Sequence, residues 1–170
     1  GCDVNPLSVV LTRPRLSPPS LSEIATRLDA LDLVSAPDCR EDLTVFYHPQ
    51  TLHSICALRA YLRRRHAAGE TDGVDRWIEM VAVNRLTGHS RGFFSVYTLP
   101  PNQAVSLASQ RKINARRKQT PPYRDVAALI MRKSRSLLKD CGEATRQLLQ
   151  VEAERMPLLA RPSHRTPELG

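Results

Sequence analysis

Apolar residues recur at the spacing of an α-helix along much of this chain, and this periodicity limits its fold more than any other feature. It runs through four segments: 20–31, 49–67, 72–87 and 124–139. The clearest is 72–87, in which four apolar residues have the spacing i, i+3, i+4, i+7: Val74, Trp77, Ile78 and Val81. Such a stripe packs against a core, so the single tryptophan is expected to be a core residue. We predict a mostly α chain with at most two or three short strands.

Capping residues indicate where several of these helices begin. Ser20 is followed three residues later by Glu23, which is the pattern of a capping box. Asp72 can cap the helix over 72–87, with Asp75 in its first turn. Asn5-Pro6 is expected to begin a helix near the start of the chain, because proline is well tolerated in a first turn.

Proline and glycine indicate where two helices end. The first helix is expected to end across Arg13-Pro14-Arg15 and Ser17-Pro18-Pro19, since proline in a helix interior removes a hydrogen bond. The helix over 72–87 is expected to end at Gly88, because glycine is favoured just after a helix C-terminus. The apolar run 43–47 is short enough to be either a strand or the lead-in to the next helix.

The central stretch 88–98 combines two glycines, His89, Arg91 and three aromatic residues. Within it, 93–98 is the best strand candidate in the chain, because it is rich in aromatic and β-branched residues. Two interpretations stay open. One is a turn followed by a buried strand, and the other is a binding loop carried between two helices.

Composition sets outer limits on the class of protein. A chain of 170 residues is long enough for one domain with a real core. No apolar run approaches the length needed to span a bilayer, so we expect no membrane partner. The four cysteines are far apart and the five histidines have no metal-ligand spacing, so we expect reduced thiols, no metal, and a cytoplasmic protein.

Positive charge is concentrated in residues 110–139. This segment has ten basic residues and one acid, Asp125, for a local charge of +9, whereas the whole chain carries +8. The basic residues are Arg111, Lys112, Arg116, Arg117, Lys118, Arg124, Arg132, Lys133, Arg135 and Lys139. Because the rest of the chain is close to neutral, the excess of positive charge is local and the protein is not uniformly basic. This concentration favours an anionic partner.

The end of this segment separates its residues by face. On one side of a helix over 124–139 lie Val126, Leu129, Ile130 and Leu137. On the opposite side lie Arg124, Arg132, Arg135 and Lys139. Such a helix can dock on a core and present a cationic row, although a simply solvated basic face remains the alternative.

Two stretches resemble bacterial S-adenosylmethionine-dependent DNA amino-methyltransferases. GCDVNPLSVVL, residues 1–11, looks like the stretch just after the family's glycine-rich cofactor loop. The block 77–138, with NRLTGHSRGFFSVYTLPPNQAVS and QRKINARRKQTPPYRDV, resembles the middle of one subgroup. The resemblance implies the helical middle region of a Rossmann-like α/β methyltransferase. It also implies that Asp3 holds the ribose of S-adenosylmethionine, flanked by Asn5 and Pro6.

The family's catalytic tetrapeptide is Asp, Asn or Ser followed by Pro-Pro and an aromatic residue. Thr120-Pro121-Pro122-Tyr123 resembles it but has Thr at the acceptor position, and it lies between basic helical segments instead of after a strand. We interpret it as non-catalytic. The glycine-rich loop is then expected before Gly1 and the catalytic tetrapeptide beyond the end of this chain. The chain would be a middle piece, and we expect it to be inactive by itself because catalysis requires both elements.

These expectations divide the chain into three parts. Residues 1–19 are the end of a cofactor-binding motif, 20–156 a helical region, and 157–170 a disordered tail. Within the helical region we expect a central loop and strand at 88–98 and basic helices over 106–139. The expected partner is double-stranded DNA and the expected reaction is methyl transfer to an exocyclic amino group of adenine or cytosine.

Two groups of residues are predicted to contact DNA. Those nearer the bases are Asn84, Arg85, His89 and Arg91. Those on the phosphate backbone are Arg111, Lys112, Arg116, Arg117 and Lys118. The alternatives are a helical nucleic-acid-binding module with no enzymatic link, and an interaction domain whose basic helix meets an acidic protein.

Overall fold

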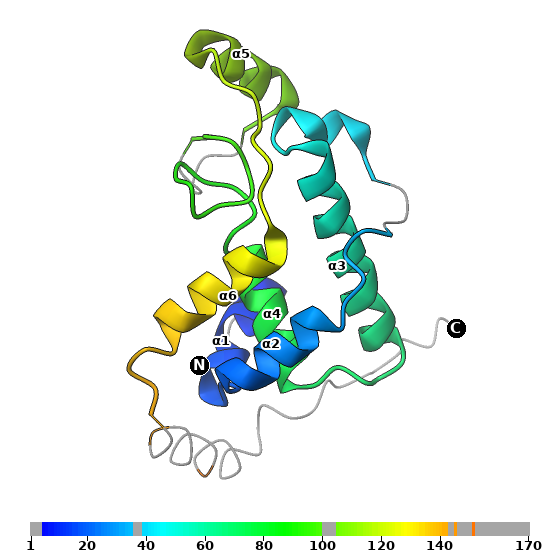
Figure 1. Cartoon of the computed structure of the whole chain (residues 1–170), viewed down its shortest axis with the longest axis vertical. Coiled ribbons are helices and arrows are strands. Elements are labelled where there is room, and N and C mark those ends of the chain that lie inside the picture. The colour runs from blue at the N-terminus through cyan, green and yellow to red at the C-terminus, as the bar shows by residue number, and fades with distance from the viewer. Residues whose placement is uncertain (1–4, 36–38, 100–104, 143–144, 146–150, 152–170) are drawn as a thin grey trace, which may run out of the picture.

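The computed structural model describes residues 5–35, 39–99, 105–142, 145 and 151, and these are mostly α-helical (Figure 1). The elements are α1 (Pro6–Leu16), α2 (Leu21–Asp29), the 3₁₀ helix η1 (Glu41–Val45), α3 (Pro49–Ala67), α4 (Gly73–Val83), α5 (Leu107–Arg117) and α6 (Val126–Leu137). The predicted mostly α chain is confirmed. The predicted tail, 157–170, lies outside the described residues.

The two predicted capping motifs are confirmed. Ser20 Oγ accepts a hydrogen bond from Glu23 N at 3.2 Å, and the Glu23 carboxylate accepts one from Ser20 N at 2.8 Å. At the start of α4, Asp75 N donates to Asp72 Oδ1 at 2.9 Å and Asp72 N donates to Asp75 Oδ2 at 3.3 Å. Each pair satisfies two backbone N–H groups that a helix N-terminus leaves without partners.

The prediction that Pro14 helps to end the first helix is wrong, because α1 continues through it; the helix ends at Leu16, directly before the predicted Ser17-Pro18-Pro19. The fixed φ of proline suits a helix, and in the last turn its missing N–H removes a single hydrogen bond, the one to the carbonyl of Val10. Pro14 is also the buried residue of α1, so packing offsets part of that loss.

The predicted end of α4 at Gly88 is also wrong, because the helix ends at Val83. Asn84 Nδ2 donates to the carbonyl of Met80 at 2.9 Å, so its side chain closes the last turn. The next backbone hydrogen bond, from Arg85 N to the carbonyl of Ala82, spans three residues instead of the four of an α-helix. This tighter turn ends the helix.

The core is built around α4, which lies in the middle of the molecule in Figure 1. Its Trp77, Ile78, Met80 and Val81 are at most 3% exposed, so the prediction of Trp77 as a core residue is confirmed. They pack with buried apolar residues of the surrounding elements: Ile24 and Leu28 of α2, Leu52 and Leu58 of α3, and Val126, Leu129 and Ile130 of α6. The amphipathic spacing of α2, α4 and α6 therefore produces one shared core.

The predicted strand over 93–98 is wrong. Backbone N–H groups of this segment donate to three separate places: Phe94 to Arg85, Val96 to Phe46, and Thr98 to Gly88. Because no neighbouring segment runs alongside to accept all three, no ladder forms, and the described residues contain only an isolated bridge between Gly88 and Tyr97. The segment is a loop held on the core by the buried side chains of Phe94 and Val96.

The run 43–47, which the sequence left open between a strand and a lead-in, enters a 3₁₀ turn instead of a strand. Its last residues, Phe46 and Tyr47, are 7% exposed and belong to the core. The carbonyl of Phe46 also accepts the bond from Val96, so this turn helps to hold the central loop.

A buried hydrogen bond joins α4 to α6. Trp77 Nε1 donates to Ser134 Oγ at 2.9 Å, and Ser134 is fully buried. We expect Ser134→Ala to lower the free energy of unfolding by about 1–3 kcal/mol, since the indole N–H would stay buried without an acceptor. Urea denaturation measures this. The exposed neighbour Ser136 is the control, and Ser136→Ala should change stability by less than about 0.5 kcal/mol; equal effects would contradict the role of this bond.

A charged network joins α2, α3 and α4. The Asp75 carboxylate, whose side chain is 0% exposed, accepts hydrogen bonds from Arg27, from Arg65 Nε at 3.0 Å and from Tyr61 Oη at 2.9 Å. Arg27 Nη2 also pairs with Asp72 at 2.7 Å. The burial of Asp75 is thus compensated from two helices that lie far from it in sequence.

Candidate nucleic-acid interface

Helix α5 presents the five predicted backbone contacts on an exposed surface: Arg111, Lys112, Arg116, Arg117 and Lys118. The buried residues Gln110 and Ile113 anchor this helix. Asn114 Nδ2 donates to the carbonyl of Val45 at 2.8 Å, which ties α5 to the end of η1. With one side fixed in this way, the cationic side chains are directed to solvent.

Tyr97 connects α5 to the central loop. The Arg117 guanidinium lies 3.8 Å from the centroid of the Tyr97 ring, a cation–π contact. The carbonyl of Tyr97 accepts hydrogen bonds from Gln110 Nε2 at 2.9 Å and from Gln119 Nε2 at 3.0 Å. These contacts from α5 and from Gln119, just after it, hold the end of the loop against the helix.

The loop also carries its own cations. The Arg85 guanidinium lies 4.3 Å from the centroid of the Phe93 ring, and the His89 ring lies 6.1 Å from the same ring. Burial lowers the pKa of Arg85 from its usual value, and its Nε is buried without a hydrogen-bond partner among the described residues. Arg85 is therefore partly built into the loop, whereas His89 and Arg91 are exposed.

Helix α6 meets the loop through Arg132. Its Nη2 donates to the carbonyl of Arg91 at 3.3 Å. A Cβ placed on Gly92 would lie 3.8 Å from Arg132 Nη2 and 3.9 Å from Arg85 Nη1, so guanidinium groups from two elements flank this glycine. Two neighbouring guanidinium groups repel each other unless an anion lies between them, and phosphate is the anion whose geometry they match best.

These groups together form what we call the basic surface. It comprises Arg85 and Arg91 of the loop, Arg132 of α6, and the five cations of α5. In Figure 1, α5 and α6 lie at different levels of the molecule, and the loop between them makes the contacts to Arg117 and Arg132 just described. The cations of 110–139 are thus divided between α5 and α6. Residues 85–97 contact Arg117 and Arg132 and so link the two groups.

No acid of the described chain forms an ion pair with the basic surface, although Asp42 is close enough to Arg111 for their charges to interact. Every ion pair found in the described ranges involves Arg27, Arg40 or Arg65, and none involves a cation of 110–139. Asp125, the one acid of that segment, uses its carboxylate to cap α6 by accepting from Ala128 N at 2.9 Å. The positive charge is therefore left available to an external anion.

The predicted faces of α6 are correct for its first turns. Val126, Leu129 and Ile130 are buried, and Arg132 is exposed on the other side. Leu137 was predicted to share the apolar face but is 38% exposed, because it lies in the last turn, where the helix extends past the core. The Nε of Arg124 is buried with no hydrogen-bond partner among the residues that the structure describes, so Arg124 is not part of the cationic row.

Asn84 does not join the basic surface through its amide. That side chain turns back to the carbonyl of Met80, as the end of α4 requires. Asn84 is thus a helix-terminating residue in this structure, and its contact with bases stays a prediction.

The predicted cofactor residues occupy the start of α1. Asp3 lies outside the described residues. Asn5 is the N-cap of α1, where its Oδ1 accepts from Leu7 N at 3.0 Å, and Pro6 is the first helical residue. Both positions match the predicted helix start.

The segment 120–123 has no regular secondary structure and links α5 to α6. Its Tyr123 is 55% exposed and packs edge-on against the ring of His48, with 5.8 Å between centroids. The following residue, Arg124, donates its N–H to Thr51 Oγ1 at 2.7 Å, which fixes the linker on α3. The segment 120–123 is thus a connection between two helices, and its interpretation as non-catalytic stays a prediction.

Sequence reasoning missed two parts of this site. Tyr97 was assigned only to a strand, and Arg132 only to a helix face, yet they join the loop to α5 and α6. Their partners, Arg117 and Arg91, lie 20 and 41 residues away in sequence. No local pattern encodes such contacts, although the aromatic content of 93–97 indicated that the loop packs on something.

Gly88 is the position where the loop is most tightly packed. A Cβ there would lie 2.5 Å from the Phe93 ring. We expect Gly88→Ala to lower the free energy of unfolding by about 1–3 kcal/mol, because the ring must move away from Arg85. Gly142→Ala is the matched control, since a Cβ at Gly142 meets nothing within 4 Å. Thermal denaturation that shows equal stability for both variants would contradict this packing.

No group of three or more His, Cys, Asp or Glu residues that could hold a metal ion occurs within the described ranges. None of the helices seen in those ranges is both long and apolar enough to cross a membrane. No family model, curated protein or solved structure matches the chain.

Proposed function

We propose that this chain binds the phosphate backbone of double-stranded DNA through the basic surface, as the helical region of an S-adenosylmethionine-dependent DNA amino-methyltransferase. One observation carries the binding part of the proposal. The five cations of α5 are exposed and have no ion-pair partner among the described residues. Exposed cations without ion-pair partners, on a helix held to the core, are suited to neutralising phosphates.

The central loop gives this surface a second contact zone. Arg85 and Arg132 flank Gly92 with no acid between them, so a phosphate at this point would relieve their mutual repulsion. The exposed His89 and Arg91 stand beside this zone and are the residues that we assign to base edges. Contacts to phosphates position a duplex, and only contacts to base edges distinguish sequences.

The methyltransferase part of the proposal depends on the resemblance of residues 1–11 and 77–138 to that family. In such an enzyme, Asp3 would hold the cofactor ribose, and the basic surface would hold the duplex while the target base is flipped into the catalytic site. The group transferred is the methyl of S-adenosylmethionine, and the acceptor is an exocyclic amino group of adenine or cytosine.

A non-enzymatic nucleic-acid-binding module is the second candidate. It is favoured by the core, which the helices of the described residues build among themselves around α4. The two candidates share DNA binding and differ in the cofactor. Calorimetric titration with S-adenosylmethionine separates them, in a protein that also carries the glycine-rich segment expected before Gly1. Cofactor binding that is lost in Asp3→Ala supports the enzyme. Absence of cofactor binding supports the module.

DNA binding itself is tested by fluorescence anisotropy with labelled duplexes of unrelated sequence. We expect all of them to bind with similar affinity, because most contacts go to phosphates. Poly-glutamate of equal charge serves as the competitor that represents an acidic protein. Displacement of the duplex by a similar charge concentration of poly-glutamate would instead favour an interaction domain for acidic proteins and would contradict the DNA assignment.

A further inference from the structure

Two of the cysteines lie next to each other in the fold, although they are far apart in sequence. Cys39 precedes η1, and Cys56 lies in α3. The thiol of Cys39 donates to the carbonyl oxygen of Leu52 at 3.9 Å. In an α-helix this carbonyl points toward the residue four positions later, which here is Cys56. The sulfur of Cys39 therefore lies against the turn of α3 that carries Cys56.

The two thiols also interact directly. Burial raises the pKa of the Cys56 thiol, and a hydrogen bond with the Cys39 thiol raises it further, to about 12. A hydrogen bond that favours the protonated form makes Cys56 the donor of this pair, while Cys39 donates to Leu52. Cys56 therefore keeps its proton at neutral pH.

Both thiols remain open to small reagents. Each side chain is half-buried at the edge of the core, and no disulfide joins the two. When one of two adjacent thiols is oxidised to a sulfenic acid, the other can condense with it to a disulfide. The contact between Cys39 and Cys56 meets this requirement.

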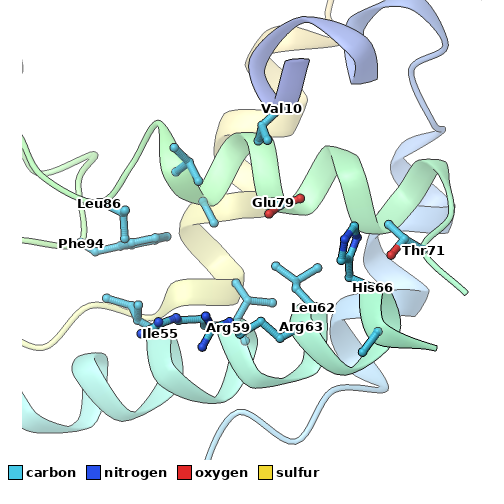
Figure 2. A pocket seen from close by; sticks show the side chains of 14 residues that line it. Val10, Ile55, Arg59, Leu62, Arg63, His66, Thr71, Glu79, Leu86 and Phe94 are labelled. Atoms are coloured by element: carbon cyan, nitrogen blue, oxygen red, sulfur yellow. The ribbon is translucent and has the colours of Figure 1, made fainter. Parts of the chain in front are cut away.

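The pair is separate from the groove between α3 and α4. This groove has a volume of about 700 Å³, and on the α3 side its lining includes Ile55, Arg59 and Leu62 (Figure 2). Neither cysteine is among the lining residues. The thiols instead lie where α3 meets the residue that precedes η1, so they form a site distinct from the groove.

We propose that Cys39 and Cys56 form a reversible disulfide when the chain meets a hydroperoxide. Cys39 supplies the sulfur that attacks the peroxide, and Cys56 supplies the sulfur that closes the bond. Such a disulfide would be transient in a reducing compartment, where thiol reductants restore both thiols.

The reaction takes two steps. The Cys39 thiolate attacks one peroxide oxygen, the O–O bond breaks, and the other oxygen leaves and takes up the proton that Cys39 lost. The sulfur of Cys56 then attacks the sulfenic acid on Cys39, the S–O bond breaks, and the oxygen leaves as water with the proton of Cys56. The two thiols lose two electrons in total, and the peroxide gains them.

The disulfide would fasten η1 to α3, because η1 lies inside the loop that it closes. The carbonyl of Val45, at the end of η1, accepts from Asn114 of α5, and the carbonyl of Phe46 accepts from Val96 of the central loop. A cross-link also reduces the freedom of the unfolded chain. The oxidised chain should therefore be the more stable form.

The test is treatment of the natural chain with an equimolar amount of hydrogen peroxide, followed by alkylation with iodoacetamide and digestion with trypsin without reduction. Cleavage after Arg27, Arg40 and Arg59 places the two cysteines in separate peptides, 28–40 and 41–59. We expect mass spectrometry of the monomer band to show these peptides joined by a disulfide. Dithiothreitol should separate them, and Cys141, also half-buried, should be recovered alkylated.

Thermal denaturation gives a second readout. Oxidation should raise the midpoint of unfolding of the natural chain by at least about 5 °C, and dithiothreitol should reverse the rise. Cys141→Ser is the matched control and should show the same rise. Cys39→Ser and Cys56→Ser should show none.

Single variants assign the two roles. In Cys56→Ser the sulfenic acid on Cys39 has no thiol to condense with, so dimedone should label peptide 28–40. In Cys39→Ser the protonated Cys56 should react slowly, so labelling of peptide 41–59 should be at least about ten-fold weaker. Circular dichroism should show the helical content of the natural chain in both variants.

Three results would overturn the proposal. The first is recovery of 28–40 and 41–59 only as separate alkylated peptides. The second is a yield of disulfides to Cys141 similar to that of the Cys39–Cys56 bond, since oxidation would then be unselective. The third is equal dimedone labelling of the two single variants, which would contradict the assigned roles. None of these results bears on duplex binding by the basic surface.

Discussion

Asp75→Ala should lower the free energy of unfolding by about 3–5 kcal/mol, the largest stability change that we expect from a single substitution in this chain. The Asp75 carboxylate is fully buried and is the shared acceptor for Arg27 of α2 and for Tyr61 and Arg65 of α3. Its removal takes away the buried charge that Arg27 and Arg65 share, and leaves Asp72 as the acid near both guanidinium groups and Glu70 as a second partner of Arg65. Because the two arginine side chains are about a quarter exposed, water offsets part of this loss, so a value near 3 kcal/mol is expected.

Urea denaturation followed by circular dichroism measures this change. Asp29→Ala is the control, because Asp29 is an exposed acid near the end of α2 and its removal should change stability by less than about 0.5 kcal/mol. If Asp75→Ala unfolds at the same urea concentration as the natural chain, the buried network does not hold α2, α3 and α4 together as described.

Arg116→Glu with Arg117→Glu should weaken duplex binding at least about ten-fold at low salt, by a similar factor for duplexes of any sequence. Two phosphate-neutralising charges are replaced by two that repel phosphate. Arg117 also loses its contact with the Tyr97 ring, so the end of the loop becomes less firmly held on α5. Fluorescence anisotropy with two unrelated duplexes measures both the loss and its uniformity.

The control for this variant is Arg13→Glu with Arg15→Glu. It makes the same change in net charge, at exposed positions in the last turn of α1, so the cost of acids near a helix C-terminus is matched as well. Equal affinity losses in both variants would show that only the total charge matters. The basic surface would then have no special role in binding.

The parts of the fold that sequence predicts are those governed by neighbours in the chain. Ser20 and Glu23 contact each other within one helical turn, as do Asp72 and Asp75, so their spacing alone indicates the caps. The buried stripe that contains Trp77 follows from helical periodicity in the same way.

The parts that sequence misses depend on residues far along the chain. The segment 93–98 has the composition of a strand, but a strand needs a partner, and its N–H groups donate instead to three separate segments. No sequence pattern indicates that Arg65 of α3 pairs with the buried Asp75 of α4. In each case local preference is overridden by a contact that only the folded chain creates.

The candidate site was predicted in composition but not in arrangement. The five cations of α5 are exposed as their pattern indicates, since one side of that helix is buried through Ile113. The division of the basic segment between α5 and α6 could not be read from its charge. Nor could the connection through Tyr97, because a cation–π contact has no sequence pattern.

The most direct test of the central claim, that the basic surface binds a polyanionic duplex, is the slope of log Kobs for duplex binding against log salt concentration. Each neutralised phosphate contributes about −0.9 to this slope. With the five cations of α5 engaged, we expect a slope of about −4 or steeper, which becomes shallower in Arg116→Glu with Arg117→Glu. A slope between zero and about −1 for the natural chain would contradict the proposed function.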